Sequence, residues 1–380
     1  MNKVFHPKTI LICSVRLIGD VILTTPLIGL LNSTFPDAAI DMLIASGTGG
    51  FLEQDPRVRN VLTVASKQVK ADSANNRHNP SIKRMFRSYD LAITMNASDR
   101  GNIIVIAAAK KLSIGFYEYT SFLKNWWKRL LLDKPLHYNK SQHVILHCKQ
   151  VSEALDIPVK QLDVKVFWNN NDVAKVSAAI NLVTQKSGYF VIHPFARWDY
   201  KFWDLNEFII VSDYLASKYN LTPVWTSSPD VAECKLLESY SAKCLLKPIS
   251  IAGNFSLNQM ACLISGARLY IGLDTAITHI AASTGVPIVA LYGPTETFRW
   301  FPWNNGGDLH QLNGYTRGSI QNDHIILIQK DCRHHNCIRP NCNNPCMQRI
   351  SSAEVIEAST TLLNKHCFKH IENGECVANC

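Results

Sequence analysis

Residues 9–31 read TILICSVRLIGDVILTTPLIGLL: a short apolar run, a turn that contains a glycine, and a second apolar segment. The first part, Thr9–Ser14, has the length and β-branched content of a buried parallel strand. The second part, Val21–Leu31, has apolar residues at helical spacing. Gly19 permits a tight turn between them. The stretch therefore predicts a strand that runs directly into a helix, which is the repeating unit of parallel α/β sheets.

The same alternation continues along the chain and indicates parallel sheets with right-handed crossovers. Asp156–Asp172 includes Pro158 and three consecutive asparagines, a composition typical of a linker. We therefore expect two doubly wound domains joined near residue 170. The expected strands are Thr9–Ser14, Ala39–Ala45, Val61–Val64, Asp90–Met95, Tyr189–His193, Thr222–Thr226, Arg268–Gly272 and Pro287–Leu291. The expected helices are Val21–Leu31, Ile82–Arg87, Asn102–Lys111, Gln142–Leu155, Leu205–Lys218, Asp230–Ser241, Thr275–Thr284 and Ser351–Leu363.

Length and composition agree with two folded domains. The chain has 380 residues, of which 47% are hydrophobic and 18% charged, so a wholly disordered protein is excluded. It contains no apolar run of about 18 residues, and its N-terminus lacks a signal-peptide core, so we expect a cytoplasmic protein without a transmembrane helix.

The net charge of +9 lies entirely in the first half. Residues 1–175 contain 23 basic and 14 acidic side chains, whereas the remainder is balanced. This indicates an anionic partner: a phosphorylated substrate, a membrane surface or a nucleic acid. The segment Phe122–Leu132 mixes aromatic, basic and aliphatic residues, which fits either an interfacial segment on anionic lipid or a core helix with a solvated basic face. One basic cluster precedes this segment in the sequence, and a second overlaps it: Lys67, Lys70, Arg77, Lys83, Arg84 and Arg87, and then Lys110, Lys111, Lys124, Lys128 and Arg129.

Asp20 is the first candidate for chemistry. It follows the first strand, at the carboxyl edge where parallel sheets bind their ligands. An aspartate at a helix start is a preferred N-cap, and it is also a possible general base. Both interpretations stay open from the sequence.

A second candidate site begins where the strand ending at Gly272 meets a helix. Asp274 and Thr275 then lie at a helix N-terminus, which attracts phosphate, and His279 follows about one turn later. A carboxylate repels phosphate, so Asp274 caps the helix or binds a hydroxyl or an ammonium. Lys201, in a loop rich in cations and aromatic residues, could neutralise a diphosphate or be a solvated surface lysine.

Three loops together resemble a known family. The stretch from Arg16 to Pro26, the stretch from Asp274 through Ala281, Ala282, Gly285 and Pro287 to Thr295, and the Lys201 loop are similar to the ADP-heptose:lipopolysaccharide heptosyltransferases of glycosyltransferase family nine. The resemblance covers roughly residues 8–365. Asp99-Arg100, Arg299-Trp300 and Pro302-Trp303 look most like the heptosyltransferase III branch.

The resemblance implies a GT-B fold of two Rossmann-like domains, with the acceptor in residues 1–170 and the nucleotide sugar in residues 171–350. A helix over 351–365 would pack back on the first domain, followed by a tail over 366–380. Asp20 would be the base of an inverting transfer, and no cofactor would be required. The implied donor-binding residues are Lys201, Asp274, Thr275, Ala276 and His279, and the implied acceptor-binding residues are Arg16, Asp99 and Arg100.

The implied partners are ADP-heptose, an anionic lipopolysaccharide core and the inner face of the inner membrane, where the enzyme would be peripheral. No nucleic acid is expected, because the basic residues form no recognisable nucleic-acid motif. Two alternatives stay open: a protein heptosyltransferase of the autotransporter type, and a basic nucleic-acid-binding protein with a C-terminal metal module.

Seven of the twelve cysteines lie in the last 49 residues. Four of them, with His334 and His335 nearby, are numerous enough for a structural zinc or iron site. Reduced thiols are the main alternative, and both are favoured over disulfides in a chain expected to be cytosolic. These four are Cys332, Cys337, Cys342 and Cys346.

Overall fold

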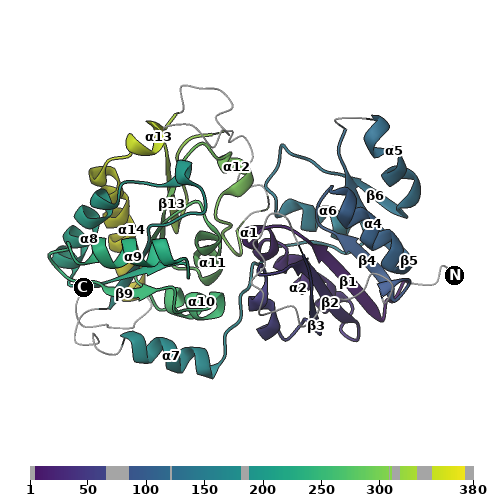
Figure 1. The fold of residues 1–380 in the computed structure, drawn as a ribbon, viewed down its shortest axis with the longest axis horizontal. Coiled ribbons are helices and arrows are strands. Elements are labelled where there is room, and N and C mark those ends of the chain that lie inside the picture. The colour runs from purple at the N-terminus through teal and green to yellow at the C-terminus, as the bar shows by residue number, and fades with distance from the viewer. Residues whose placement is uncertain are drawn as a thin grey trace. The chain divides into compact units, whose positions relative to one another are not determined.

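The computed structural model describes residues 5–65, 85–119, 122–180, 188–307, 309, 317–331 and 345–372. The chain forms two compact α/β units (Figure 1). The first comprises Met1–Phe167 and Asn305–Leu312, and the second comprises Trp168–Asn304 and Asn313–Cys380. The chain thus passes into the second unit close to the expected linker, but a short segment after Asn304 returns to the first unit. Asn305 fixes that return, since its side chain exchanges two hydrogen bonds with the backbone of Val164.

The first unit contains a six-stranded parallel sheet in the order β3-β2-β1-β4-β5-β6. The strand order reverses between β1 and β4, and in such sheets ligands bind outside the carboxyl ends of the strands at that reversal. The strands are β1 (Thr9–Ser14), β2 (Ala39–Ala45), β3 (Asn60–Val64), β4 (Tyr89–Thr94), β5 (Ala109–Tyr117) and β6 (Lys134–His137).

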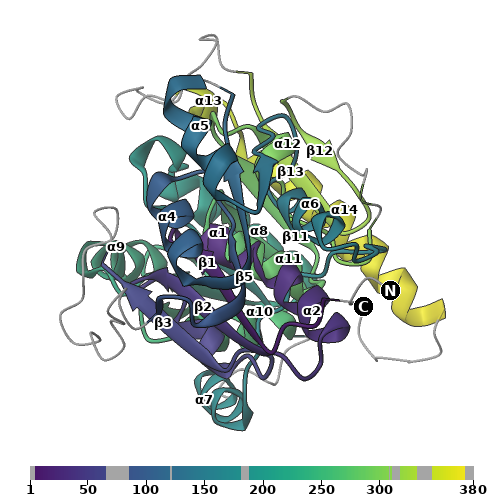
Figure 2. The same cartoon turned by 90° about the vertical axis from the view of Figure 1, so that its right-hand side faces the viewer.

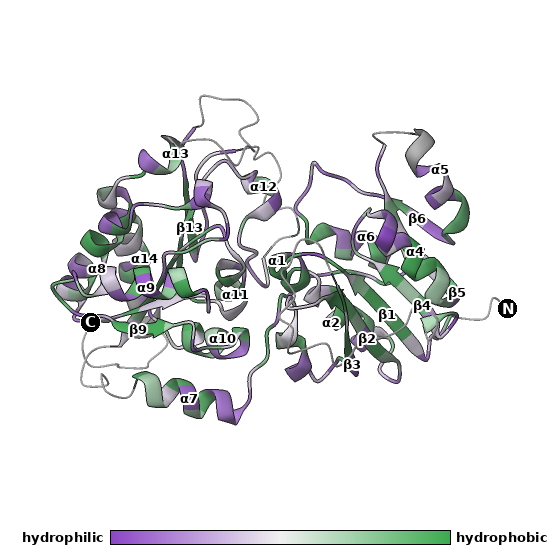
Figure 3. Ribbon diagram, in the orientation of Figure 1, coloured by the Kyte–Doolittle hydropathy of each residue, from purple (hydrophilic) through white to green (hydrophobic). Residues whose placement is uncertain are grey.

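Helices cover the first sheet (Figures 1 and 2). They are α1 (Ile18–Ile22), α2 (Thr25–Thr34), α4 (Asp99–Ala108), α5 (Phe122–Leu131) and α6 (Leu146–Ala154), with a 3-10 turn over Gly50–Gln54. Helix α4 packs on β1, β4 and β5, where Ile104 and Val105 share a buried cluster with Leu11 and Cys13 of β1. Figure 3 shows the strands as largely hydrophobic, as expected for a sheet that is covered on its faces.

The second unit contains a seven-stranded sheet in the order β12-β13-β11-β10-β7-β8-β9. Its strands pair in parallel except for the edge strand β12, which is antiparallel to β13. The strands are β7 (Tyr189–His193), β8 (Thr222–Ser227), β9 (Ile249–Ala252), β10 (Tyr270–Leu273), β11 (Ile288–Tyr292), β12 (Ile320–Gln321) and β13 (Ile325–Gln329).

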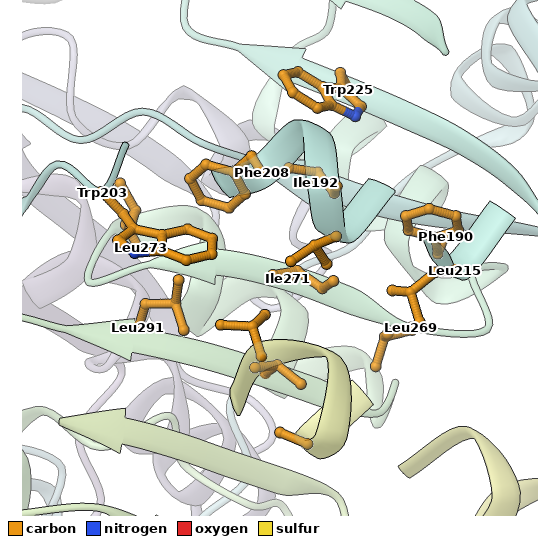
Figure 4. Close-up of a cluster of buried hydrophobic side chains, with 14 of the residues drawn as sticks. Phe190, Ile192, Trp203, Phe208, Leu215, Trp225, Leu269, Ile271, Leu273 and Leu291 are labelled. Atoms are coloured by element: carbon orange, nitrogen blue, oxygen red, sulfur yellow. The ribbon is translucent and has the colours of Figure 1, made fainter. Parts of the chain in front are cut away.

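Aromatic residues fill the core of the second unit. Trp203 packs edge-to-face on Phe208, and Phe208 packs in turn against Trp225 (Figure 4). The helices of this unit are α7 (Asn170–Ile180), α8 (Leu205–Tyr219), α9 (Val231–Ser241), α10 (Leu257–Ser265), α11 (Ala276–Thr284), α12 (Thr297–Trp300), α13 (Pro345–Gln348) and α14 (Ser352–Glu372), with a 3-10 turn over Asp199–Lys201.

Three expected elements differ in the structure. The single helix predicted over Val21–Leu31 is two helices, because Pro26 lacks the N–H that a continuous helix needs and is accommodated only in a first turn. The helix predicted to reach Lys111 ends at Ala108, where the chain enters β5. The C-terminal helix begins at Ser352, one residue after its expected start, runs on to Glu372 instead of ending at Leu363, and packs on α8 and β11 of the second unit. Its buried residues Val355 and Leu362 belong to the core of the second unit. The helix predicted over Ile82–Arg87 lies largely outside the described residues.

Candidate active site

Asp20 lies in the first turn of α1, directly after β1. The N-cap position of this helix is Leu17, and Asp20 is the third helical residue, so the N-cap interpretation is wrong. Its carboxylate is therefore not the N-cap group of this helix. Asp20 lines a small cavity together with Ser14, Arg16, Leu23, Thr24, Met95 and Val144.

The surroundings of Asp20 make it a stronger base than an ordinary aspartate. Burial raises its pKa above 3.8, although the positive charge of Arg16 and the backbone N–H of Leu17 oppose this shift. The Arg16 Nε atom lies 3.6 Å from Asp20 Oδ1. A carboxylate with a raised pKa accepts a proton more readily, which is the property that a general base requires.

The structure places the predicted acceptor residues Asp99 and Arg100 at the start of α4. This helix follows β4, the neighbour of β1, so both residues lie at the sheet edge that also bears Asp20. Asp99 Oδ1 forms an ion pair with Lys128 Nζ at 2.7 Å, and Arg100 donates to the backbone oxygen of Ala65 at 2.6 Å. Arg16 and Asp20 are thus brought into contact, whereas Asp99 and Arg100 contact other parts of the first unit.

In the second unit, Lys201 and Asp274 form one site. Lys201 Nζ lies 2.6 Å from Asp274 Oδ2 and also donates to the backbone oxygen of Asp274 at 3.3 Å. Asp274 therefore binds an ammonium, one of the alternatives that the sequence left open. An ammonium has three N–H groups, so these two contacts leave one N–H for a ligand oxygen.

A glycine shapes the joint between β10 and α11. A Cβ atom at Gly272 would lie 2.2 Å from the Tyr270 hydroxyl. Because glycine leaves this space, the Tyr270 hydroxyl comes within 3.1 Å of Thr278 Oγ1 in the first turn of α11. The contact ties strand to helix and fixes the intervening residues, Asp274 and Thr275.

Two buried polar atoms at this helix start have no hydrogen-bond partner among the described residues: Thr275 Oγ1 and His279 Nδ1. Burial lowers the pKa of His279 to about 4; the charge of Asp274 opposes the shift and that of Lys201 favours it. His279 is therefore a neutral imidazole near pH 7. Ala276 is the first residue of α11, where backbone N–H groups have no partner within the helix. Because unpaired buried polar atoms are costly, this arrangement favours a polar ligand at the N-terminus of α11.

Thr295 and Gln329 support this site, and sequence patterns predict a role for neither. Thr295 Oγ1 donates to Asp274 Oδ2, the oxygen that also faces Lys201. Gln329, at the end of β13, donates to the backbone oxygens of Gly293 and Thr295 at 2.6 and 2.8 Å. Thr295 lies in a stretch that resembles the family, but nothing in the sequence connects Gln329 with the loop that it holds.

Most of the predicted cysteine cluster lies outside the residues that the structure describes. Cys332, Cys337 and Cys342 do not belong to the described residues, whereas Cys346 is buried in α13. Within the described ranges, no group of three or more histidine, cysteine or acidic side chains is arranged to hold a metal ion.

Each unit has a Rossmann-like parallel sheet with polar side chains at its carboxyl edge, an arrangement that many nucleotide-binding α/β enzymes share. The family model described as "Glycosyltransferase family 9 (heptosyltransferase)" matches residues 81–315. This is more than half of the chain, which therefore belongs to glycosyltransferase family 9. The predicted family and the predicted class of enzyme are both confirmed.

Curated relatives agree with this assignment. The chain is 28% identical over 289 residues to "Lipopolysaccharide heptosyltransferase 3" of Escherichia coli K12, covering 75% of this chain and 82% of the relative. It is 23% identical over 310 residues to "Lipopolysaccharide core heptosyltransferase OpsX" of Haemophilus influenzae, covering 79% and 83%. Neither the protein-heptosyltransferase nor the nucleic-acid alternative is favoured by these matches.

Solved structures confirm the fold. The crystal structure of a family 9 glycosyl transferase from Veillonella parvula aligns with a TM-score of 0.75 at 21% identity, covering 94% of this chain and 98% of the other. E. coli ADP-heptose lps heptosyltransferase II aligns with a TM-score of 0.69 at 16% identity, covering 94% and 99%. The GT-B fold expected from the sequence is therefore present.

Proposed function

We propose that this chain transfers a heptose from ADP-heptose to the inner core of lipopolysaccharide, with inversion at the anomeric carbon. Family membership and the names of the curated relatives support this reaction. The structural observation that carries the proposal lies at the N-terminus of α11, beside Lys201. Thr275 Oγ1 and His279 Nδ1 are buried there with no hydrogen-bond partner in the part of the chain that the structure describes.

The second unit would hold the donor. The remaining N–H of Lys201 and the backbone N–H groups at the start of α11, from Ala276 on, would bind the diphosphate. Thr275 Oγ1 and neutral His279 Nδ1 would form hydrogen bonds with donor oxygens or hydroxyls. Asp274 forms an ion pair with Lys201, so we expect it to set the position of the ammonium.

The first unit would hold the acceptor and the base. An acceptor hydroxyl loses its proton to the Asp20 carboxylate as its oxygen bonds to the anomeric carbon of the heptose. On the opposite face the bond from that carbon to the diphosphate oxygen breaks, and ADP leaves with the bonding electrons. Lys201 and the N-terminus of α11 stabilise the negative charge that develops on the leaving group. Arg16, Asp99 and Arg100 would position the acceptor.

The site of action would be the cytoplasmic face of the inner membrane. None of the helices in the described ranges is long and apolar enough to cross a bilayer. The surplus of nine basic residues in the first 175 suits an acceptor that carries phosphate and lies in a membrane. The enzyme would therefore be a peripheral protein that meets its acceptor at the lipid surface.

Core oligosaccharide from a deletion strain tests the proposal. Mass spectrometry should show a core one heptose lighter than the parent, restored by the wild-type gene but not by a gene with Asp20→Asn. A core of unchanged mass in the deletion strain would refute the proposed acceptor.

A further inference from the structure

Helix α5 of the first unit presents an apolar side to solvent and a polar side to the protein. Its residues Asn125 and Lys128 are only 8% and 3% exposed. Trp126, Leu130 and Leu131 are 51%, 70% and 55% exposed. This is the reverse of the usual surface helix, whose apolar stripe faces the core. Such a reversal indicates that the outer side has a partner of its own.

The polar contacts beneath α5 hold it in this orientation. Lys128 Nζ donates to the backbone oxygen of Ala97 at 2.7 Å and to Asn125 Oδ1 at 3.0 Å, and it pairs with Asp99. Asn125 Nδ2 donates to the backbone oxygen of Glu118 at 2.8 Å. Rotating the helix to bury its apolar side would break all of these bonds. The exposure of Trp126 and Leu130 is therefore built into the fold.

The composition of the exposed side fits a lipid surface. Trp126, Arg129 and Leu130 are three and four residues apart, so they lie on one face of the helix. Arg129 is exposed and lies over the ring of Tyr117, 5.4 Å from its centroid. The helix sequence has no acidic residue, and the exposed Arg129 places a positive charge beside the apolar side chains. Tryptophan and leucine beside basic residues are typical of segments that lie in the interface of an anionic bilayer.

The size of the patch argues against a protein partner. Three exposed apolar side chains on a helix of ten residues form a patch of roughly a few hundred Å², a size at which exposed apolar patches are often functional. A specific protein interface buries about 800 Å² on each partner. A bilayer needs less, since insertion of apolar side chains and attraction of Arg129 to anionic headgroups act together.

We propose that α5 is the membrane-docking element of this protein, and that Trp126 and Leu130 insert among the headgroups of an anionic bilayer. The inference rests on the proposed function, because a lipid-anchored acceptor requires the first unit to meet a membrane. It adds the surface that makes the contact and the side chains responsible.

Vesicle sedimentation of the full chain tests this proposal. Wild-type protein should bind vesicles of phosphatidylethanolamine and phosphatidylglycerol, and bind those of phosphatidylcholine at least tenfold more weakly. The double variant Trp126→Ser, Leu130→Ser should lower the partition coefficient on anionic vesicles at least tenfold. Leu245→Ser is the matched control, since Leu245 is an exposed leucine of the second unit, 87% accessible.

Two measurements keep the outcomes separate. ADP binding and transfer to a delipidated core oligosaccharide should be unchanged in the double variant, which shows that it is folded and that transfer does not need the docking surface. The proposal would be overturned if wild-type protein does not bind anionic vesicles, or if the double variant binds them as strongly as wild type. A smaller oligomer in the double variant would assign α5 to a second copy of the chain. If wild-type protein binds the vesicles but transfers no heptose, the proposed function is refuted and the docking proposal is not.

Discussion

Replacement of Asp20 by asparagine is the sharpest perturbation of the proposed mechanism. Asparagine matches aspartate in size but takes no proton at neutral pH. A positioned general base contributes about 10²- to 10⁴-fold to a rate, so kcat should fall by this factor, about 3–5 kcal/mol in activation free energy. Stability should change by less than about 1 kcal/mol, because the ion pair with Arg16 is 3.6 Å long and Arg16 is 42% exposed.

The assay measures ADP release with a saturating core acceptor, and ADP affinity by calorimetry. The ADP dissociation constant should stay within about twofold, since the proposed donor site lies in the second unit. Asp37→Asn is the control, because Asp37 is an exposed aspartate of the same unit. A turnover within about threefold of wild type in Asp20→Asn would refute the assignment of the base.

Three other perturbations follow from the electrostatics. Arg16→Gln removes a positive charge that lowers the pKa of Asp20, so the pKa of Asp20 should rise. Because the base must be deprotonated, the acidic side of the pH profile of kcat/KM should move to higher pH. An unchanged profile would contradict the contact between Arg16 and Asp20. Lys201→Ala should raise the donor KM and lower kcat. The ratio kcat/KM should fall by roughly 10- to 100-fold, which corresponds to the free energy of one charge-assisted hydrogen bond. Unchanged donor kinetics would show that Lys201 does not contact the donor. Burial lowers the pKa values of His193 and His279 to about 4, so below pH 6.5 the unfolded chain binds more protons than the folded chain. The free energy of unfolding in urea should therefore fall by about 2 kcal/mol for each histidine between pH 6.5 and 5. An unfolding free energy that does not change over this range would contradict their burial.

Local sequence patterns predicted the strands that matter most. Thr9–Ser14 and Tyr189–His193 have the bounds expected of them, because each is a short β-rich apolar run with a clear end. The start of β5 was predicted as helix, since Ala107, Ala108 and Ala109 favour helices. Pairing of this segment with β4 outweighs that weak preference.

The candidate site was only partly accessible from sequence. Asp20, Asp274 and Thr275 each follow a predicted strand and lie at the start of a helix. In a parallel sheet this order places them at the carboxyl edge, so their position follows from topology alone. The contact between Lys201 and Asp274 spans 73 positions and depends on β10 lying beside β7, a strand order that local patterns do not encode. Gln329 acts through two backbone oxygens, so its role leaves no signature in residue type or spacing.

The most direct test of the central claim is transfer by the purified protein. ADP-heptose and a heptose-deficient lipopolysaccharide core are incubated with the enzyme, and both product mass and ADP are measured. The account predicts a core heavier by one heptose and one ADP released for each heptose transferred, with a configuration at the new linkage opposite to that of the donor. Release of ADP without a heavier core, or a linkage that retains the donor configuration, would contradict it.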